Sequence, residues 1–242
     1  MKKTFVAAAA IAALAGIASA HTTYLDPFGM SSDVDPFFLN QGFNHLDIVA
    51  VELDNHDMGF HMDIVVNADI SSATGTDWGK FLVFYDTIPG QGRNDNPWGR
   101  NIASSNGADY FIGGWADGGG GAELYRATPT GWEFVSDATH MNPAGLHVRL
   151  TDAAAGLFHV GVGSHALGNP AVGSNVYLDV ATTGGSGGDP GVDHLSLNSI
   201  ATSGWGMGST SGDFLEYEVE PAPGSLGVLG IAGLLAGRRR RA

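Results

Sequence analysis

The stretch LDIVAVELDNHDMGFHMDIVVNADI, residues 46–70, decides the fold of this chain. Its first part, residues 46–53, and its last part, residues 59–70, are short runs of β-branched and other apolar residues, which favour β-strands. Between them, Asp54-Asn55-His56-Asp57 is a polar cluster typical of a turn. The stretch therefore predicts a β-hairpin.

Similar runs recur along the chain, separated by loops rich in glycine, proline and asparagine such as PGQGRNDNPWG (89–99) and TGGSGGDPG (183–191). Many short strands with turns between them predict an all-β fold, an antiparallel β-sandwich of jelly-roll or immunoglobulin-like type. Helix is expected only as a turn at residues 152–156, and residues 21–44 are expected to form an irregular strap. The further predicted strands are 80–86, 108–115, 122–126, 132–136, 146–150, 157–162, 176–180 and 214–219.

The first 20 residues have the order of a secretory signal peptide: basic Lys2 and Lys3, an apolar run over residues 5–17, and Ala18-Ser19-Ala20 as a small-residue cleavage site. The alternative is an apolar first helix of the fold. The signal predicts export, with His21 as the first residue of the mature protein.

The 242-residue chain has no cysteine, 37 glycines and a net charge of −14, so a single domain of residues 21–219 must be held by burial alone. Outside its two ends, only five basic residues balance the acidic ones. A surface this acidic repels nucleic acid and anionic lipid and attracts cations, and it equally serves solubility.

The C-terminus, residues 220–242, reads EPAPGSLGVLGIAGLLAGRRRRA. Its apolar run is shorter than the roughly 20 residues of a straight transmembrane helix, and the arginines beyond it would stay on the cytoplasmic side. The order Pro221, Pro223, Gly224, apolar run and Arg238-Arg239-Arg240-Arg241 resembles a PEP-CTERM sorting tail, although Glu-Pro-Ala-Pro replaces the usual Pro-Glu-Pro. The resemblance implies a sorting helix, transient membrane insertion, cleavage by an exosortase-type transpeptidase, and delivery to the cell surface or its matrix. A permanently retained anchor is the alternative.

The body offers a second resemblance through NADISSATGTDWGKFLVFYDTIPG (67–90), NPWGRNIASSNGADYFIGGWADGGGGAELYR (96–126) and YLDVATTGGSGGDPGVDHLS (177–196). These segments resemble those of β-sandwich modules related to carbohydrate-binding module family nine and to DOMON-type domains. The resemblance extends over roughly residues 46–197. The resemblance implies the fold and, for many members of such families, sugar binding.

Sugar recognition needs aromatic faces for the apolar side of the ring and planar polar groups for its hydroxyls. The loop around Trp98 supplies these together with Asn96 and Arg100, and Trp115 follows beside Asp117. These five residues are the predicted carbohydrate site, with core packing as the alternative for both tryptophans. Core positions are expected for the remaining tryptophans, Trp78, Trp132 and Trp205.

A structural calcium ion is a further possibility, because hard divalent ions take carboxylate oxygens and would order glycine-rich loops. The two acidic loops that offer ligands are DPFGMSSDVDP (26–36) and GGDPGVD (187–193), without the EF-hand order. Their candidate ligands are Asp26, Asp33, Asp35, Asp189 and Asp193.

Catalytic motifs find little support. Gly184-Gly185-Ser186-Gly187-Gly188 fits G-x-S-x-G, but Asp189-Pro190-Gly191 follows where a nucleophile elbow needs a helix. His56 and His61, an odd number of residues apart, are expected on opposite faces of a strand. A mature amino-terminal His21 could form a copper site, given a second histidine; the chain offers His45, His56, His61 and His140 without a spacing that selects among them.

The sequence thus predicts a non-enzymatic, exported, acidic β-sandwich sorted to the cell surface or extracellular matrix, with weak carbohydrate or exopolysaccharide binding. The alternative from another class is a structural surface protein without a small ligand. A copper site at His21 is the third hypothesis.

Overall fold

The computed structural model describes residues 21–56, 58–71, 79–139 and 142–221. The predicted signal peptide, residues 1–20, lies outside the described residues. So do Trp78, His140 and the predicted sorting residues beyond Pro221, which are Pro223, Gly224 and Arg238 to Arg241.

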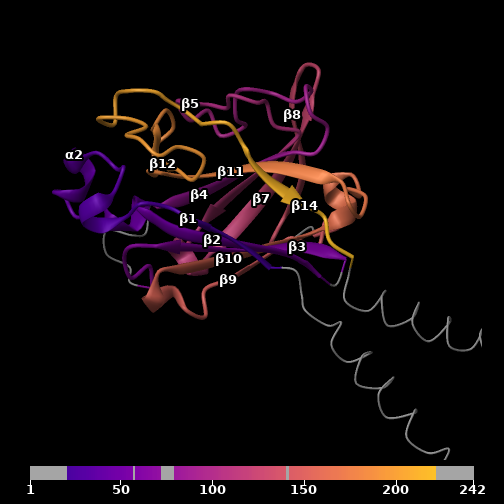
Figure 1. The fold of residues 1–242 in the computed structure, drawn as a ribbon, viewed down its shortest axis with the longest axis horizontal. Coiled ribbons are helices and arrows are strands. Elements are labelled where there is room, and N and C mark those ends of the chain that lie inside the picture. The colour runs from indigo at the N-terminus through magenta and orange to yellow at the C-terminus, as the bar shows by residue number, and fades with distance from the viewer. Residues whose placement is uncertain (1–20, 57, 72–78, 140–141, 222–242) are drawn as a thin grey trace, which may run out of the picture.

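Two β-sheets packed face to face form the body, which confirms the predicted all-β sandwich (Figure 1). The first sheet has five antiparallel strands in the order β1-β2-β3-β10-β9. Its strands are β1 (His21–Leu25), β2 (Ile48–His56), β3 (Gly59–Val66), β10 (Leu157–Gly163) and β9 (His147–Arg149).

The second sheet has seven strands, with the order β12-β11-β4-β6-β7-β8 and β14 paired to β11. A separate parallel pair joins β5 (Ile102–Ala103) to β13 (Ser209–Thr210). The strands of the second sheet are β4 (Lys80–Asp86), β6 (Tyr110–Trp115), β7 (Gly121–Thr128), β8 (Gly131–Asp137), β11 (Asn175–Thr183), β12 (Gly191–His194) and β14 (Leu215–Glu218).

The helical elements that the structure describes are all short. They are η1 (Gly29–Ser31), α2 (Pro36–Leu39), η2 (Asn44–Leu46), η3 (Asp117–Gly119), η4 (Ala153–Ala155) and η5 (Ser164–Leu167). The predicted turn at residues 152–156 is confirmed as η4. Among the described residues, no helix is long and apolar enough to cross a membrane.

The predicted hairpin is confirmed as β2 and β3, but its turn is shorter than expected. Residues 54–56 continue β2, with His56 paired to Gly59, and the chain reverses next to Met58, whose φ is 65°. Polar residues at the exposed end of a strand have the composition of a turn, so the pattern placed the strand end too early.

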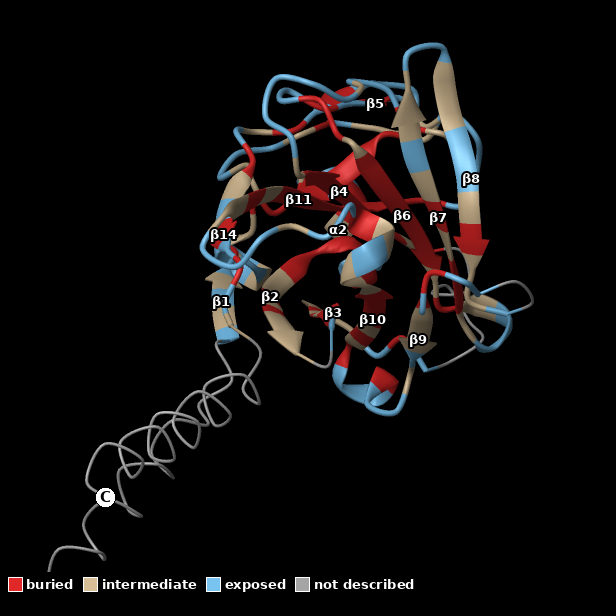
Figure 2. Cartoon of the chain, turned by 90° about the vertical axis from the view of Figure 1, so that its right-hand side faces the viewer, coloured by how far each residue is buried: buried red, intermediate tan, exposed pale blue. Residues whose placement is uncertain are grey.

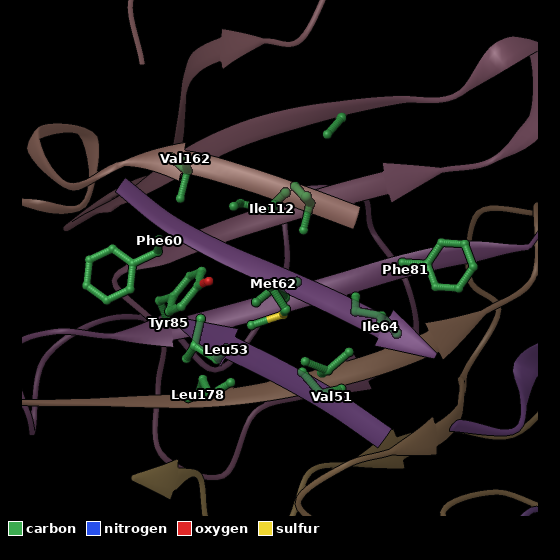
Figure 3. Close-up of a cluster of buried hydrophobic side chains, with 14 of the residues drawn as sticks. Val51, Leu53, Phe60, Met62, Ile64, Phe81, Tyr85, Ile112, Val162 and Leu178 are labelled. Atoms are coloured by element: carbon green, nitrogen blue, oxygen red, sulfur yellow. The ribbon is translucent and has the colours of Figure 1, made fainter. Parts of the chain in front are cut away.

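The main core lies between the sheets and is built mainly from alternate residues of the strands of both sheets. Val51, Leu53, Met62 and Ile64 of the hairpin all point into it, where they meet Tyr85 and its neighbours from the second sheet (Figure 3). Figure 2 shows that the buried residues concentrate between the two sheets. The opposite side chains of the same strands therefore form two outer faces, and these carry the candidate sites.

The N-terminal segment is more regular than the predicted strap. Residues 21–25 form β1, which pairs with β2 from His21↔Asp54 to Leu25↔Ala50. Phe38 of α2 then packs with Trp205 in a small separate core, at 4.8 Å between ring centroids. The predicted packing role of Trp205 is thereby confirmed.

Asn55, near the end of β2, holds the end of the described chain. Its Nδ2 donates to the carbonyl oxygen of Glu220 at 2.7 Å, and its Oδ1 accepts from the Glu220 backbone N–H at 2.9 Å and from the Tyr217 hydroxyl at 2.5 Å. Because Asn55 pairs with β3 and lies beside His21↔Asp54, both ends of the described body lie at the same edge.

Candidate functional site

The predicted sugar-binding tryptophans lie together on the outer face of the second sheet. Trp98 covers Gly113 of β6 so closely that a Cβ there would come within 2.2 Å of its ring, and Trp115 covers Gly121 in the same way at 2.3 Å. The centroids of the two indoles are 6.2 Å apart, and both side chains are half-buried. Glycines on the strands beneath thus make room for the two indoles.

Tyr125 of β7 and Trp132 of β8 extend this face, and we call Trp98, Trp115, Tyr125 and Trp132 the aromatic platform. The polar atoms of Trp98, Tyr125 and Trp132 donate to carboxylates. Glu123 Oε2 accepts from Trp98 Nε1 at 2.9 Å and from the Tyr125 hydroxyl at 2.8 Å. Trp132 packs against the buried cluster of this face, as predicted, while its Nε1 donates to Asp95 Oδ1 at 3.0 Å.

The other predicted sugar ligands have partners within the chain. Asn96 is buried, its Nδ2 donates to the carbonyl oxygens of Arg100 and Ile102 at 3.0 and 3.2 Å, and its Oδ1 accepts from the Arg100 N–H at 3.0 Å. The Arg100 guanidinium lies 5.8 Å from the Trp98 ring centroid and faces Asp189. Asp117 accepts from Lys80 at the far end of β6. These contacts hold the loops that carry the tryptophans.

Three of the five predicted calcium ligands, Asp26, Asp33 and Asp193, do come together, with oxygen atoms within 4.8 Å of one another. Asp26 and Asp33 follow β1, and Asp193 belongs to β12, so the cluster lies where the N-terminal segment meets the second sheet. All three side chains are buried. The remaining two ligands lie elsewhere: Asp35 caps α2, and Asp189 faces Arg100.

Burial sets the electrostatics of this acidic cluster. It raises the pKa of Asp26 to about 9 and that of Asp33 to about 6, with neighbouring carboxylates adding to both shifts, and it raises the pKa of Asp193 well above its usual range. Asp193 accepts backbone N–H groups from Ile48 and His194. Within the described part of the chain, the carboxylate oxygens of Asp26 and Asp33 have no hydrogen-bond partner, although they are buried. A bound cation would satisfy them.

A site that the sequence did not predict lies on the outer face of the first sheet. A pocket of about 300 Å³ there is lined by His21, His56, His61 and His159 together with several carboxylates. The expectation for His56 and His61 was wrong: they belong to two strands, and their rings stack at 3.9 Å between centroids. The hairpin turn falls between them, so strand periodicity does not relate their side chains.

Burial, together with the neighbouring imidazoles, lowers the pKa of His61 to about 4, so this ring is neutral at neutral pH. The copper hypothesis finds His21 in the same pocket, but its Nε2 lies 3.3 Å from Glu52 Oε2. His45 is buried in a different part of the molecule, beside Phe43. The alternation of histidine and carboxylate along residues 52–63 was the available signal for this pocket.

Asp179, His194 and Ser209 form a buried hydrogen-bonded series with the Asp-His-Ser arrangement of a nucleophilic triad. Asp179 Oδ2 lies 2.7 Å from His194 Nδ1, and His194 Nε2 lies 3.1 Å from Ser209 Oγ. The Ser209 oxygen also accepts from the Gly191 N–H at 2.8 Å, and all three side chains are buried. These buried hydrogen bonds therefore connect β11, β12 and β13.

The chain matches no protein-family model, and no curated protein matches it either. The two family resemblances therefore rest on the quoted residues alone.

Proposed function

We propose that the protein is an exported β-sandwich, sorted to the bacterial cell surface or matrix, that binds carbohydrate weakly through its aromatic platform. The observation that carries the binding proposal is the pair of half-buried indoles of Trp98 and Trp115, 6.2 Å apart on one sheet face. Stacked pyranose rings need such apolar surfaces, with polar groups at their edges.

Glu123 supplies the polar group at the centre of the platform. Its Oε2 already accepts from Trp98 and Tyr125, which fixes the carboxylate and orients both rings. A fixed carboxylate beside fixed rings costs little conformational entropy when a sugar binds. Asn96 and Arg100 serve the site by holding the Trp98 loop, and contact with sugar falls to the platform itself.

The test is retention of the purified full chain on immobilised polysaccharides and a glycan array, with calcium and with chelator. Trp115→Ala and Glu123→Gln should lose retention while the protein stays folded. The matched control is Phe28→Ala, which removes an aromatic side chain that is 49% exposed outside the platform. Retention that survives both platform variants would refute the site, and silence from folded wild-type protein would favour the structural surface protein.

Sorting is carried by the tail resemblance and is tested separately. Replacing Arg238 to Arg241 with alanine should leave the protein unsorted in cells that have an exosortase-type transpeptidase, as shown by fractionation and by the size of the mature chain. The same size and location in the variant would contradict the proposal. This outcome does not depend on sugar binding.

We also propose that the acidic cluster of Asp26, Asp33 and Asp193 holds a structural calcium ion. The supporting observation is that the carboxylate oxygens of Asp26 and Asp33 are buried without hydrogen-bond partners among the residues that the structure describes. Hard cations take about six to eight oxygen ligands, of which these carboxylates would supply a part. The ion would fix the segment after β1 against β12.

A further inference from the structure

Three histidines from three adjacent strands meet on the outer face of the first sheet: His61 of β3, His159 of β10 and His147 of β9. One ligand nitrogen of each lies within 4.8 Å of the others. The strand register explains the meeting, since His61 and His147 both pair with Gly161, and His159 lies two residues before it on the same face.

Gly161 is the residue that makes this arrangement possible. A Cβ at this position would come within 2.2 Å of His147 Cε1 and 2.6 Å of its Nε2. The His147 ring therefore lies over the middle strand, in space that any other residue would fill. Gly161 has an ordinary strand backbone conformation, so the absence of a side chain here serves the histidine rather than the backbone.

The rings of His147 and His159 are held by acceptors on the sides away from each other. His159 Nδ1 lies 2.5 Å from Asp63 Oδ1, and His147 Nδ1 lies 3.2 Å from the carbonyl oxygen of Gly145. Because the oxygen beside each Nδ1 can only accept, the neutral form of each ring carries its proton on Nδ1 and has a lone pair on Nε2. A carboxylate or carbonyl behind a histidine is the usual arrangement for a metal ligand.

The two Nε2 atoms, 3.4 Å apart, face one another. Two nitrogens that each lie about 2.05 Å from a tetrahedral zinc ion are about 3.3 Å apart, whereas neighbouring nitrogens of a square-planar ion are only about 2.9 Å apart. The observed separation fits the tetrahedral ion. Two lone pairs that converge at this distance are stabilised by a cation between them.

Two of the three histidines, His61 and His159, border the open pocket described above, which gives an ion a path from solvent. Four carboxylates, Glu52, Asp54, Asp63 and Asp152, line this pocket against a single arginine, Arg149, so its potential favours cations. His56 stacks on His61 and directs its Nδ1 to Asp54 at 2.5 Å, which supports the His61 ring.

We propose that His61, His147 and His159 bind a divalent transition-metal ion with a tetrahedral preference, zinc above all, with the fourth position open to the pocket. Asp63 and the Gly145 carbonyl oxygen position two of the ligands. The site goes beyond carbohydrate binding, lies on the other sheet from the aromatic platform, and does not use the predicted copper ligand His21.

The test is a zinc titration of the full chain, produced without a histidine tag and stripped of metal by a chelator. A chromophoric competitor reports affinity, and excess calcium is present throughout to fill oxygen-ligand sites. We expect one equivalent of zinc to bind at sub-micromolar Kd. Cobalt substituted for zinc should give the intense visible absorption of a tetrahedral ion.

Gly161→Ala is the decisive variant, because it keeps all nine histidines and the three atoms nearest to the added Cβ all belong to the His147 ring. We expect zinc affinity to fall at least about 100-fold and the tetrahedral cobalt spectrum to disappear, as in His159→Ala. Matched controls are Gly187→Ala, where a Cβ meets nothing within 4 Å, and His165→Ala, which removes an exposed histidine outside the cluster. Both controls should bind zinc like the wild type.

Circular dichroism and thermal melts show whether each variant is folded. If Gly161→Ala is unfolded, His147→Gln and His159→Gln replace it as the deciding variants. Wild-type binding weaker than about 10 μM, an octahedral cobalt spectrum, or equal affinity in folded cluster and control variants would each overturn the proposal.

Discussion

His147 and His159 face one another through Nε2 atoms 3.4 Å apart, although they lie on different strands and each is held from behind by an oxygen. For His159 that oxygen belongs to Asp63 of β3, the strand on its other side. Residues of three strands therefore fix the His159 imidazole. The Asp63 carboxylate can be substituted without changing a proposed metal ligand.

Asp63→Asn should weaken zinc binding about 10- to 100-fold, because the amide no longer fixes the His159 tautomer or raises its basicity. Asp152→Asn is the matched control: it removes the same charge from the same pocket, but the Asp152 carboxylate accepts from Thr151 rather than contacting a histidine. Isothermal titration calorimetry of both variants checks this. Equal losses would mean that the carboxylates act only through overall charge.

Calcium should stabilise the fold through Asp26. At about 100 times its Kd, the ion contributes about 2.7 kcal/mol, which raises the Tm of a body of this size by about 5 to 10 °C. Asp26→Asn should lose most of this rise, since its buried carboxylate is removed. Asp35→Asn is the control, because Asp35 caps α2 and lies outside the cluster. Thermal melts in calcium and in chelator test this prediction. A calcium-induced rise in Tm that is unchanged in Asp26→Asn would contradict the site.

Asn96→Ala should cost about 2 to 3 kcal/mol of unfolding free energy, because it leaves three backbone groups of a buried loop without their partner. Urea unfolding measures the loss. Other asparagines are poor controls. Asn94→Ala would remove a hydrogen bond to the Ser104 carbonyl oxygen, and Asn106→Ala would remove the acceptor of the Phe214 N–H. Asn169 has a positive φ, so alanine there would strain the backbone. A more informative comparison is Asn96→Asp, which keeps the acceptor for the Arg100 N–H but places a buried carboxylate oxygen against the Arg100 and Ile102 carbonyl oxygens, so it should lose at least as much stability as alanine.

Acid should destabilise the protein partly through His45. Burial lowers the pKa of this histidine from 6.5 to about 4, so between these values the unfolded chain binds a proton that the folded protein does not. The stabilising contribution of neutral His45 is therefore full above pH 6.5 and falls as the pH drops toward 4, by about 2 kcal/mol at pH 5. His45→Gln should flatten this dependence in melts from pH 4 to 7 with chelator present. A slope as steep as the wild type's would exclude His45 as its source.

The strands were predictable where burial alone selects the residues. Lys80–Asp86 is almost continuously buried and was predicted to the residue, because a run of apolar and aromatic side chains this dense has few alternatives. β1 was missed because it is an edge strand with alternating half-buried and exposed side chains, HTTYL, and its identity comes from pairing with β2. β12 was missed because it reads as part of an acidic loop.

The candidate sites, like the strands, were predictable only in the features that local sequence determines. The residues of the acidic cluster and the indoles of the platform were predictable as residue types. Their partners depend on loop packing over distances that no local pattern records. His61 and His147 are neighbours only because both pair with Gly161. Strand order and register, which sequence periodicity does not give, create the histidine cluster.

The hydrogen bonds of Asn55 have a mechanical consequence. β14 pairs with β11 from Asn175↔Glu218 inward, so a force pulling on the chain beyond Pro221 would peel these pairs apart one at a time. The two hydrogen bonds between Asn55 and Glu220 lie between that first pair and the pulled end, so they take the force first. They transmit it to β2, the second strand of the other sheet. A body tethered by its tail would thus resist tension with both sheets at once.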